Sequence, residues 1–335
     1  MKRHVKVSLL LVTAILVLGI AALRQAYIAY QQPLPPITVQ SGRNALWMRH
    51  AWVGQPHSGE DVRQLALMLQ RHRITDIFVH VGPLDGTGAI DPAKYPHAAE
   101  FIQRLKADHS QVCIQAWVGQ IEKGGAGPLD LSNGQVRTTI IGTAKKLLTL
   151  GFDGIHYNIE PIVSGNPHFV ALLRDTHTVT QALGKIESVS GYKVLPLAVG
   201  GVVSQALSRA TTAFWDPTYC EEVAGCVDQL AVMMYDTALP YDFLYGRATA
   251  DQIGRLTRLL GARIPLFIGV PTYEDQRWTF HAEAENMESG LRGIRQGIAG
   301  IAPDAERNVG VAIYADWTTD PAEWETYRRL WLPPG

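Results

Sequence analysis

The chain has 335 residues, of which 47% are hydrophobic and 18% are charged, and its 30 lysines and arginines nearly balance its 31 aspartates and glutamates. This composition is that of a folded globular protein and excludes wholesale disorder. The net charge of −1 gives no electrostatic attraction for nucleic acid. Three cysteines are too few to build a disulfide-rich scaffold.

The N-terminal segment is typical of an export signal. A basic start, MKRHVK, precedes an uncharged apolar run, VSLLLVTAILVLGIAAL, that ends at Arg24. This pattern predicts a transmembrane signal-anchor over residues 1–30, with a cleaved signal peptide as the alternative. Because the basic end stays in the cytoplasm, we expect the rest of the chain to be periplasmic or extracellular. It would be held at the membrane through the N-terminal helix, or secreted after cleavage.

A proline-rich stretch, QQPLPP, comes next and predicts a stiff spacer over residues 31–40. Beyond it, strand-like and helix-like patterns alternate eight times. The strand candidates are short apolar runs at 44–49, 76–81, 112–117, 153–159, 193–199, 228–235, 265–270 and 309–314. The helix candidates, with apolar residues at a helical period, are 58–72, 96–107, 135–150, 167–183, 201–210, 249–261, 284–298 and 321–331.

Alternating strands and helices indicate parallel strands, and continuous apolar strands indicate a sheet covered on both faces. Eight such units predict an α/β fold, a single (β/α)₈ TIM barrel over residues 41–335. No GxGxxG follows the first strand and the sequence has no P-loop, which argues against a nucleotide-binding domain. In such a barrel the chemistry lies at the C-terminal ends of the strands.

The fourth strand candidate carries the clearest chemical signal. It reads GFDGIHYNIEP over residues 151–161. Because alternate residues of a strand share a face, His156, Asn158 and Glu160 point to the same side. A carboxyl group at the barrel mouth, partly removed from water, would have the raised pKa that a general acid needs. The simpler alternative is a solvated Glu160 in the loop after the strand.

This segment resembles the DGxDxDxE signature of glycoside hydrolase family 18, the chitinases and related endo-β-N-acetylglucosaminidases. Asp153, Gly154 and Glu160 match the signature, while His156 and Asn158 stand where the family has its other two aspartates. The Asn-x-Glu variant is more similar to glycoside hydrolase family 85. The resemblance implies a clan-level relative with the same barrel.

Later strands extend the resemblance in the same order. The sixth strand ends in MMYD over residues 233–236, which is similar to the family's MxY(D/N) motif. The run IGVPTY, ending at Tyr273, resembles the GxPxY of the seventh strand. The run GVAIYADW, with Tyr314 and Trp317, stands in the place of the eighth-strand segment. The third strand departs from the family, because QAWVG replaces the usual SxGG.

The resemblance implies a retaining glycosidase that cleaves β-linked N-acetylhexosamine-containing glycan, with the substrate's own 2-acetamido oxygen as the nucleophile. One enzyme carboxylic acid is then enough, and Glu160 is the matching acid/base. Asn158 would orient the acetamido group, Tyr235 would donate to its oxygen, and Asp236 would contact the sugar or the acid. The expected partner is a glycan or polysaccharide, and we expect neither a metal ion nor another cofactor.

Other functions stay open on the residues alone. Glu160 and Asp236 could form the two-carboxylate pair of a glycosidase that needs no acetamido group. The barrel could also bind carbohydrate without cleaving it, although an intact Glu160 argues against this. A metal-assisted lyase or isomerase is less favoured, because few histidines and carboxylates cluster at strand ends.

The substrate-binding candidates come from several strand ends. Tyr273, Tyr314 and Trp317 follow from the resemblance. His156 is a further candidate, which could equally tune Asn158 or be a satisfied core residue. The ends of the first three strands supply the aromatic and polar candidates Trp52, His80, Gln115 and Trp117.

Two cysteines, Cys220 and Cys226, are separated by the polar sequence EEVAG. In an oxidising compartment this spacing predicts a small-loop disulfide, with two unpaired thiols as the alternative. We expect a monomer.

Overall fold

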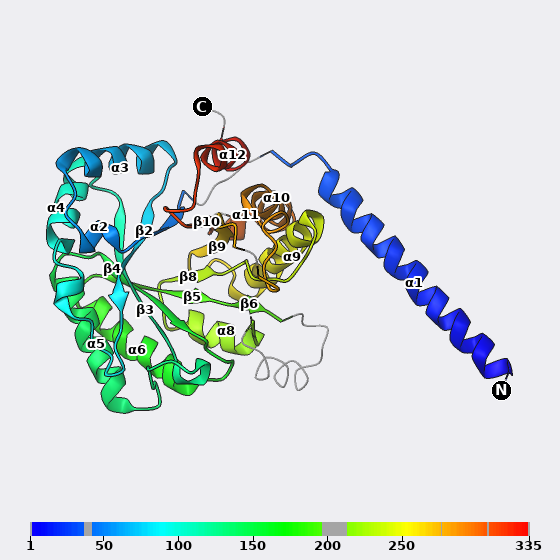
Figure 1. The fold of residues 1–335 in the computed structure, drawn as a ribbon, viewed down its shortest axis with the longest axis horizontal. Coiled ribbons are helices and arrows are strands. Elements are labelled where there is room, and N and C mark those ends of the chain that lie inside the picture. Colours follow the sequence, from blue (N-terminus) through cyan, green and yellow to red (C-terminus); the bar gives the residue numbers. More distant parts are fainter. Residues whose placement is uncertain (1, 37–41, 196–212, 276, 307, 334–335) are drawn as a thin grey trace.

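The computed structural model describes residues 2–36, 42–195, 213–275, 277–306 and 308–333. The chain forms a barrel from which one long N-terminal helix projects (Figure 1). Eight parallel strands close the barrel in the order β1-β10-β9-β8-β5-β4-β3-β2. This confirms the predicted (β/α)₈ architecture. The barrel strands are β1 Ala45–Met48, β2 Asp76–Pro83, β3 Cys113–Ile121, β4 Gly154–Glu160, β5 Ile186–Gly191, β8 Gln229–Val232, β9 Leu266–Pro271 and β10 Val309–Tyr314.

Helices surround the barrel, and polar side chains fix where several of them begin. Ser58 forms a capping box with Asp61 at the start of α3, and Asp320 forms one with Glu323 at the start of α12. The predicted helix at 201–210 lies outside the described residues. The helices that follow the spacer are α2 Ala51–Gly54, α3 Gly59–Arg71, α4 Ala98–Asp108, α5 Gly134–Thr149, α6 Pro167–Ala182, α8 Pro217–Ala224, α9 Asp242–Leu260, α10 Met287–Ile298, α11 Pro303–Glu306 and α12 Pro321–Trp331.

The predicted fifth strand, 193–199, is wrong. The barrel strand is β5, Ile186–Gly191, and Lys193–Val194 forms β6, which pairs with β7 (Phe214–Trp215) outside the barrel. β5 reads IESVSG, so it is too polar to match an apolar strand pattern. Ser188 and Ser190 are nevertheless buried, because they find partners inside the barrel.

The barrel interior holds a chain of hydrogen-bonded polar side chains. His156 Nδ1 lies 2.7 Å from Ser188 Oγ, and Ser188 donates to Gln115 Oε1 at 2.6 Å. Gln115 donates to Gln229 at 2.8 Å, and Gln229 donates to Asp76 at 3.0 Å. Four strands are thereby tied to β4 through side chains as well as through the backbone.

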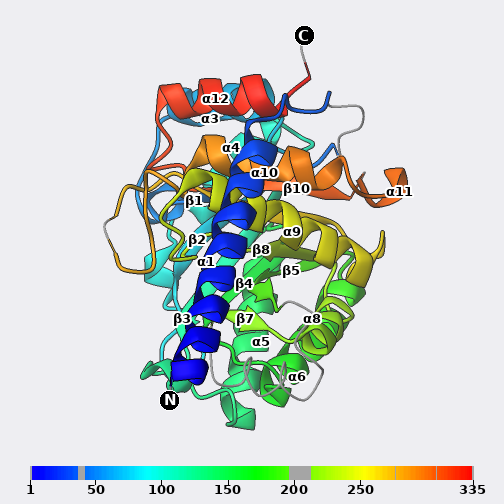
Figure 2. The same ribbon diagram turned by 90° about the vertical axis from the view of Figure 1, so that its right-hand side faces the viewer.

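The N-terminal segment is helical from Lys2 to Gln31 as α1. Its C-terminal end packs beside α9, where the rings of Tyr27 and Phe243 meet edge to face at 5.7 Å, and the rest of the helix projects away from the barrel (Figures 1 and 2). Among the described residues, no helix has the length and apolar character needed to cross a membrane. The predicted transmembrane anchor therefore gains no support from the structure.

Cys220 and Cys226 are free thiols, so the predicted disulfide is not formed. Cys220 lies inside α8 and is fully buried, whereas Cys226 follows the end of that helix. Both thiols are instead small packing groups of the core.

One buried carboxyl group on β5 has no hydrogen-bond partner. Neither oxygen of Glu187 makes a hydrogen bond, and the nearest ring nitrogen, His177 Nδ1, is 3.9 Å away. Burial and the neighbouring carboxylate of Asp228 raise the pKa of Glu187 well above its ordinary value. The folded protein therefore favours the protonated form.

We expect Glu187→Gln to stabilise the protein at high pH. The raised pKa means that wild-type stability is complete below the unfolded-state pKa and falls as pH rises through the folded-state pKa. The variant escapes this loss, so its free energy of unfolding should exceed that of the wild type by about 1–3 kcal/mol at pH 8 and match it near pH 4. Urea unfolding at both pH values measures the difference. The exposed Glu222→Gln is the control, and a variant less stable than wild type at pH 8 would contradict the expectation.

Candidate active site

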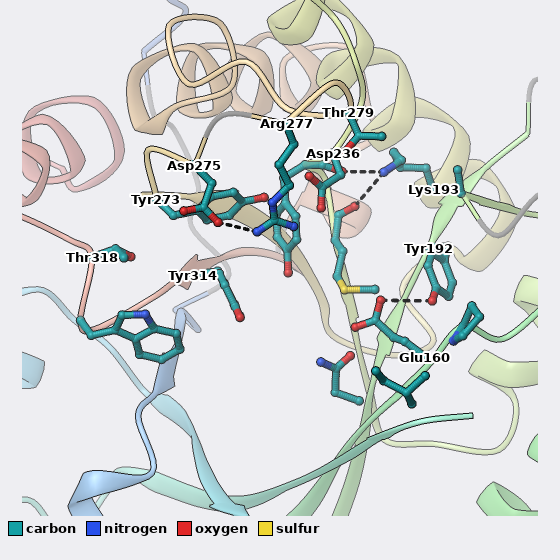
Figure 3. Close-up of a pocket in the computed structure, with 17 residues that line it drawn as sticks. Glu160, Tyr192, Lys193, Asp236, Tyr273, Asp275, Arg277, Thr279, Tyr314 and Thr318 are labelled. Carbon is teal, nitrogen blue, oxygen red and sulfur yellow. Dashed lines mark hydrogen bonds and ion pairs between the residues drawn. The ribbon is translucent and has the colours of Figure 1, made fainter. Parts of the chain in front are cut away.

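A cavity of about 650 Å³ opens at the C-terminal ends of the barrel strands. Its walls come from β3, β4, β6 and β10 and from the segments that follow β5, β8, β9 and β10 (Figure 3). The mouth of a barrel is where catalytic groups from different strands converge. All four predicted catalytic residues line this cavity: Asn158, Glu160, Tyr235 and Asp236.

β4 directs two of these side chains into the cavity. Asn158 and Glu160 are two positions apart and share the inward face, as the alternation of a strand requires. Asn158 makes a side-chain hydrogen bond with Glu160. Its own oxygen, Oδ1, is buried and has no hydrogen-bond partner. The amide therefore gives its N–H to the acid and keeps a free acceptor.

Glu160 lies in an environment that favours its protonated form. Burial raises the pKa of Glu160, hydrogen bonds from Tyr192 and Asn158 oppose that rise, and the charge of Asp236 adds to it. The Tyr192 hydroxyl donates to Glu160 Oε2 at 3.2 Å (Figure 3). A carboxyl group held in this way can give up a proton and then be stabilised as the anion.

The segment after β8 supplies Tyr235 and Asp236. Burial raises the pKa of Tyr235 well above its ordinary value, so its hydroxyl stays protonated as a hydrogen-bond donor. Its ring lies over β9 at Gly269, where an added Cβ would come within 3.1 Å of Tyr235 Cε1. This close approach explains why glycine precedes Val-Pro in the seventh-strand motif.

Asp236 has a left-handed backbone, with φ of 53°, which is uncommon for a residue other than glycine. Burial raises the pKa of its carboxyl group, while Arg277 and Lys193 lower it and a hydrogen bond with Tyr273 lowers it further. One oxygen, Oδ1, is buried without a hydrogen-bond partner. The carboxylate is thus aimed into the cavity and is ready to accept a donor.

Aromatic side chains form one wall of the cavity. Tyr273, Tyr314 and Trp317, all predicted to bind substrate, line it. Tyr314 is central, with ring centroids 5.5 Å from Tyr235 and 5.5 Å from Trp317. Flat aromatic faces of this kind suit the apolar faces of sugar rings.

Three other predicted binding residues lie inside the barrel and are not among those that line this cavity. His156 is fully buried, stacks on Phe78 at 3.7 Å and is bonded to serines of β5. Burial lowers the pKa of His156 to about 3, so the ring is neutral. Gln115 belongs to the same interior network, and Trp117 packs in the aromatic layer within the barrel. The structure thus places His156 as a core histidine.

Trp52 and His80 are also outside this cavity. Trp52, on α2, donates to Asp316 at 2.8 Å and stacks on His57. His80, on β2, packs against Trp117 with ring centroids 4.7 Å apart. The described residues that line the cavity come from β3 and later elements, and none comes from the ends of β1 and β2. The candidates there, Trp52 and His80, therefore lie outside the cavity.

Several lining residues were not predicted from the sequence, among them the ionisable side chains of Tyr192, Lys193, Asp275 and Arg277. Tyr192 and Lys193 follow the barrel strand that was misplaced, so they could not be read as a strand end. Arg277 forms an ion pair with Asp275 and lies over the Tyr273 ring at 5.8 Å (Figure 3). A correct fifth strand would have identified the first two.

Within the described part of the chain, no group of three histidines, cysteines or carboxylates is arranged to hold a metal ion.

No protein-family model matches the sequence, and no curated protein sequence matches it. Solved structures do match over most of the chain. The Group IV chitinase of Ostrinia furnacalis in complex with allosamidin aligns with a TM-score of 0.57 and 13% identity, over 85% of this chain and 97% of that chain. The glycoside hydrolase family 18 chitinase ChiB of Flavobacterium johnsoniae aligns with a TM-score of 0.50 and 10% identity, over 86% and 94%.

The chain has the barrel fold of the family 18 chitinases. The spore cortex-lytic enzyme SleL of Bacillus cereus shares it too, with a TM-score of 0.54 and 10% identity over 88% of this chain and 75% of that chain. The predicted resemblance to family 18 is confirmed at the level of the barrel. The similarity of Asn158-x-Glu160 to family 85 stays a prediction from the sequence.

We expect Tyr192→Phe to raise the pKa of Glu160 further. The Tyr192 hydroxyl donates to the carboxylate and so favours its charged form, and phenylalanine removes the donor while keeping the ring. A carbon-13 NMR titration of the glutamate side-chain carboxyls measures the shift. Tyr219→Phe is the matched control, because the Tyr219 hydroxyl donates to the Asn166 carbonyl instead. An unchanged or lowered pKa in Tyr192→Phe would exclude this role for the hydroxyl.

Proposed function

We propose that the protein is a retaining glycoside hydrolase that cleaves β-linked N-acetylhexosamine-containing glycan by substrate-assisted catalysis. The observation that carries this proposal is the pairing of the half-buried acid Glu160 with the unpartnered acceptor Asn158 Oδ1 in one cavity. A buried acceptor without a donor is unfavourable, so it favours a ligand that brings an N–H. The 2-acetamido group of the sugar is such a ligand.

In the first step, Asn158 Oδ1 accepts the acetamido N–H and the Tyr235 hydroxyl donates to the acetamido oxygen. That oxygen attacks the anomeric carbon as the glycosidic bond breaks, and Glu160 gives its proton to the departing oxygen. The raised pKa of Glu160 keeps this proton available near neutral pH. The sugar is left as a cyclic oxazolinium whose positive charge lies near the Asp236 carboxylate.

In the second step, Glu160 is a carboxylate and takes a proton from water. The water oxygen attacks the anomeric carbon from the side that the leaving group occupied, which opens the ring and restores the acetamido group. Two inversions give net retention, and Glu160 ends protonated as it began. Tyr192 donates to Glu160 throughout and stabilises the anionic form between the steps.

The structural neighbours support the class of substrate. Two of them are named as chitinases, and chitin is a β-linked polymer of N-acetylglucosamine. The aromatic wall of Tyr273, Tyr314 and Trp317 supplies stacking faces for a chain of such sugars.

Glu160→Gln should lower the turnover of an aryl β-N-acetylglucosaminide by on the order of 10²–10⁴-fold, the usual contribution of a general acid. Glutamine keeps the shape of the side chain, so the fold and the binding of allosamidin should be preserved. Initial rates on aryl N-acetylglucosaminides, chitooligosaccharides and peptidoglycan fragments measure the first effect, and calorimetry measures the second. Glu274→Gln, an exposed carboxyl that does not line the cavity, is the control.

The same assays separate the alternatives. Asn158→Ala should reduce cleavage of acetamido substrates and leave the binding of unmodified glucosides unaltered. Efficient cleavage of plain glucosides that depends on Asp236 and not on Asn158 would instead indicate the two-carboxylate mechanism. An inactive wild type that still binds oligosaccharide would indicate a carbohydrate-binding barrel, and a fully active Glu160→Gln would refute the assignment of the acid.

We also propose that the barrel lies outside the cytoplasm. A basic N-terminus before an apolar run supports this, as do the side chains of Leu16, Leu18 and Ile20 on α1, which are 60%, 69% and 66% exposed. A C-terminal alkaline phosphatase fusion in a bacterial host should be active with the full chain and inactive without residues 2–24. Equal activity of the two fusions would contradict export by this segment.

A further inference from the structure

A buried lysine lies in the wall of the cavity with no role in the mechanism above. Lys193 begins β6, immediately after Tyr192, and its side chain is 5% exposed. It belongs to the small sheet outside the barrel, so its position depends on the connection between β5 and β6. Fully charged lysines are rarely buried without partners, so its contacts indicate what it does.

The ammonium group of Lys193 binds the backbone after β8. Its Nζ donates to the Tyr235 carbonyl at 2.7 Å and lies 3.5 Å from the Met233 carbonyl (Figure 3). On its other side, the ring of Phe214 on β7 has its centroid 6.0 Å away. The lysine therefore joins β6 to the segment that carries two of the proposed catalytic side chains.

That segment needs a restraint of this kind. β8 ends at Val232, and Met233 N still donates to the Gly191 carbonyl of β5 at 2.9 Å, so Tyr235 and Asp236 follow the end of the barrel strand. Asp236 then adopts its left-handed backbone, which costs about 1–3 kcal/mol for a residue other than glycine and persists only where surrounding contacts hold it. The Tyr235 carbonyl belongs to the peptide group that joins Tyr235 to Asp236. The hydrogen bond from Lys193 therefore restrains the backbone directly before the left-handed residue Asp236.

Three carboxyl groups face the ammonium from different elements. Asp236 follows β8, Glu285 precedes α10 and Glu160 ends β4, and each favours the charged lysine. Burial acts in the opposite direction and lowers the pKa of Lys193 to about 8. Burial also raises the pKa of Glu285 to about 7, where Thr237 N–H donates to its carboxyl. The charge on the lysine is thus sensitive to pH in the range in which an enzyme is assayed.

We propose that Lys193 is a positioning residue for the reaction: its ammonium holds the Tyr235–Asp236 peptide in place. This inference rests on the proposed function, because it assigns Tyr235 and Asp236 the roles given there. A lysine that only stabilised the fold would change the unfolding temperature and leave the pH dependence of the reaction as it was.

Lys193→Met keeps an unbranched side chain of four heavy atoms and removes the ammonium group. We expect kcat to fall by on the order of 10²-fold, the effect of a misplacement of about 1 Å, with KM changed by less than about threefold. The pH profile is the sharper readout. Both Glu160 and Lys193 must be protonated in the wild type, so the logarithm of kcat/KM should fall by two for each pH unit at high pH, and by one in Lys193→Met.

Lys185→Met is the matched control, because Lys185 lies 3.9 Å from Asp153 at the start of β4, far from the mouth. It should keep the wild-type kcat and the wild-type slope. A Lys193→Met enzyme that keeps both kcat and the twofold slope, in a preparation where Glu160→Gln is inactive, would overturn the positioning role and leave the proposed function standing. Activity retained by Glu160→Gln would overturn the proposed function instead.

A second measurement needs no activity and no substitution of the lysine. Nitrogen-15 NMR of lysine side chains in the full-length protein should show one ammonium that titrates near pH 8. In Asp236→Asn that titration should move to lower pH, because the anion that favours the charged lysine is gone. The same titration in both proteins would show that the ammonium does not lie beside the Tyr235–Asp236 peptide, and would refute the inference even if Lys193→Met fails to fold.

Discussion

The neutral imidazole of His156 is the constraint on which the site depends. Trp47 donates its indole N–H to His156 Nε2 at 3.2 Å, and an indole nitrogen is a donor only, so Nε2 accepts. The single ring proton is then on Nδ1 and is donated to Ser188. Burial lowers the pKa of the ring to about 3, so this tautomer is kept at any pH of interest. Inside the barrel, the ring therefore joins β4 to β1 through Trp47 and to β5 through Ser188.

The position of the acid follows from that anchor. His156 is paired with Ser188 in the parallel register of β4 and β5, and a slip by one residue would turn every inward side chain outward. Because the side chains of a strand alternate, an inward His156 places Asn158 and Glu160 inward as well, two and four residues nearer the mouth. The network of hydrogen-bonded side chains continues through Gln115 to Asp76. Side chains of other barrel strands therefore also hold β4 in place. A buried histidine that does not touch the cavity thus determines what lines it.

The same network explains what could be predicted from the sequence. The alternation on β4 identified Glu160 and Asn158, because apolar and polar positions differ there. β5 was missed because Glu187, Ser188 and Ser190 are polar residues, and no local pattern shows that the two serines find a partner on another strand. That error hid Tyr192 and Lys193, which follow the strand directly. Trp52 and His80 were expected at the site because every strand end counts equally in a sequence, whereas the cavity opens over only part of the barrel mouth.

The charge around Glu160 also depends on Lys193, which follows β5, the strand that the sequence pattern did not predict. Asn158 is neutral where the family signature has an aspartate, and Lys193 adds a positive charge beside the cavity. Both make the surroundings of Glu160 less negative, so burial is the main cause of its raised pKa. In the proposed reaction, a positive charge grows on the acetamido ring, and Asp236 is the carboxylate left to face it. Burial raises the pKa of the Asp236 carboxyl, Arg277 and Lys193 oppose that rise, and one carboxyl oxygen lacks a hydrogen-bond donor. In the proposed reaction, the Asn158 amide would orient the acetamido group and the Asp236 carboxylate would balance the charge, two tasks that the signature would give to one aspartate.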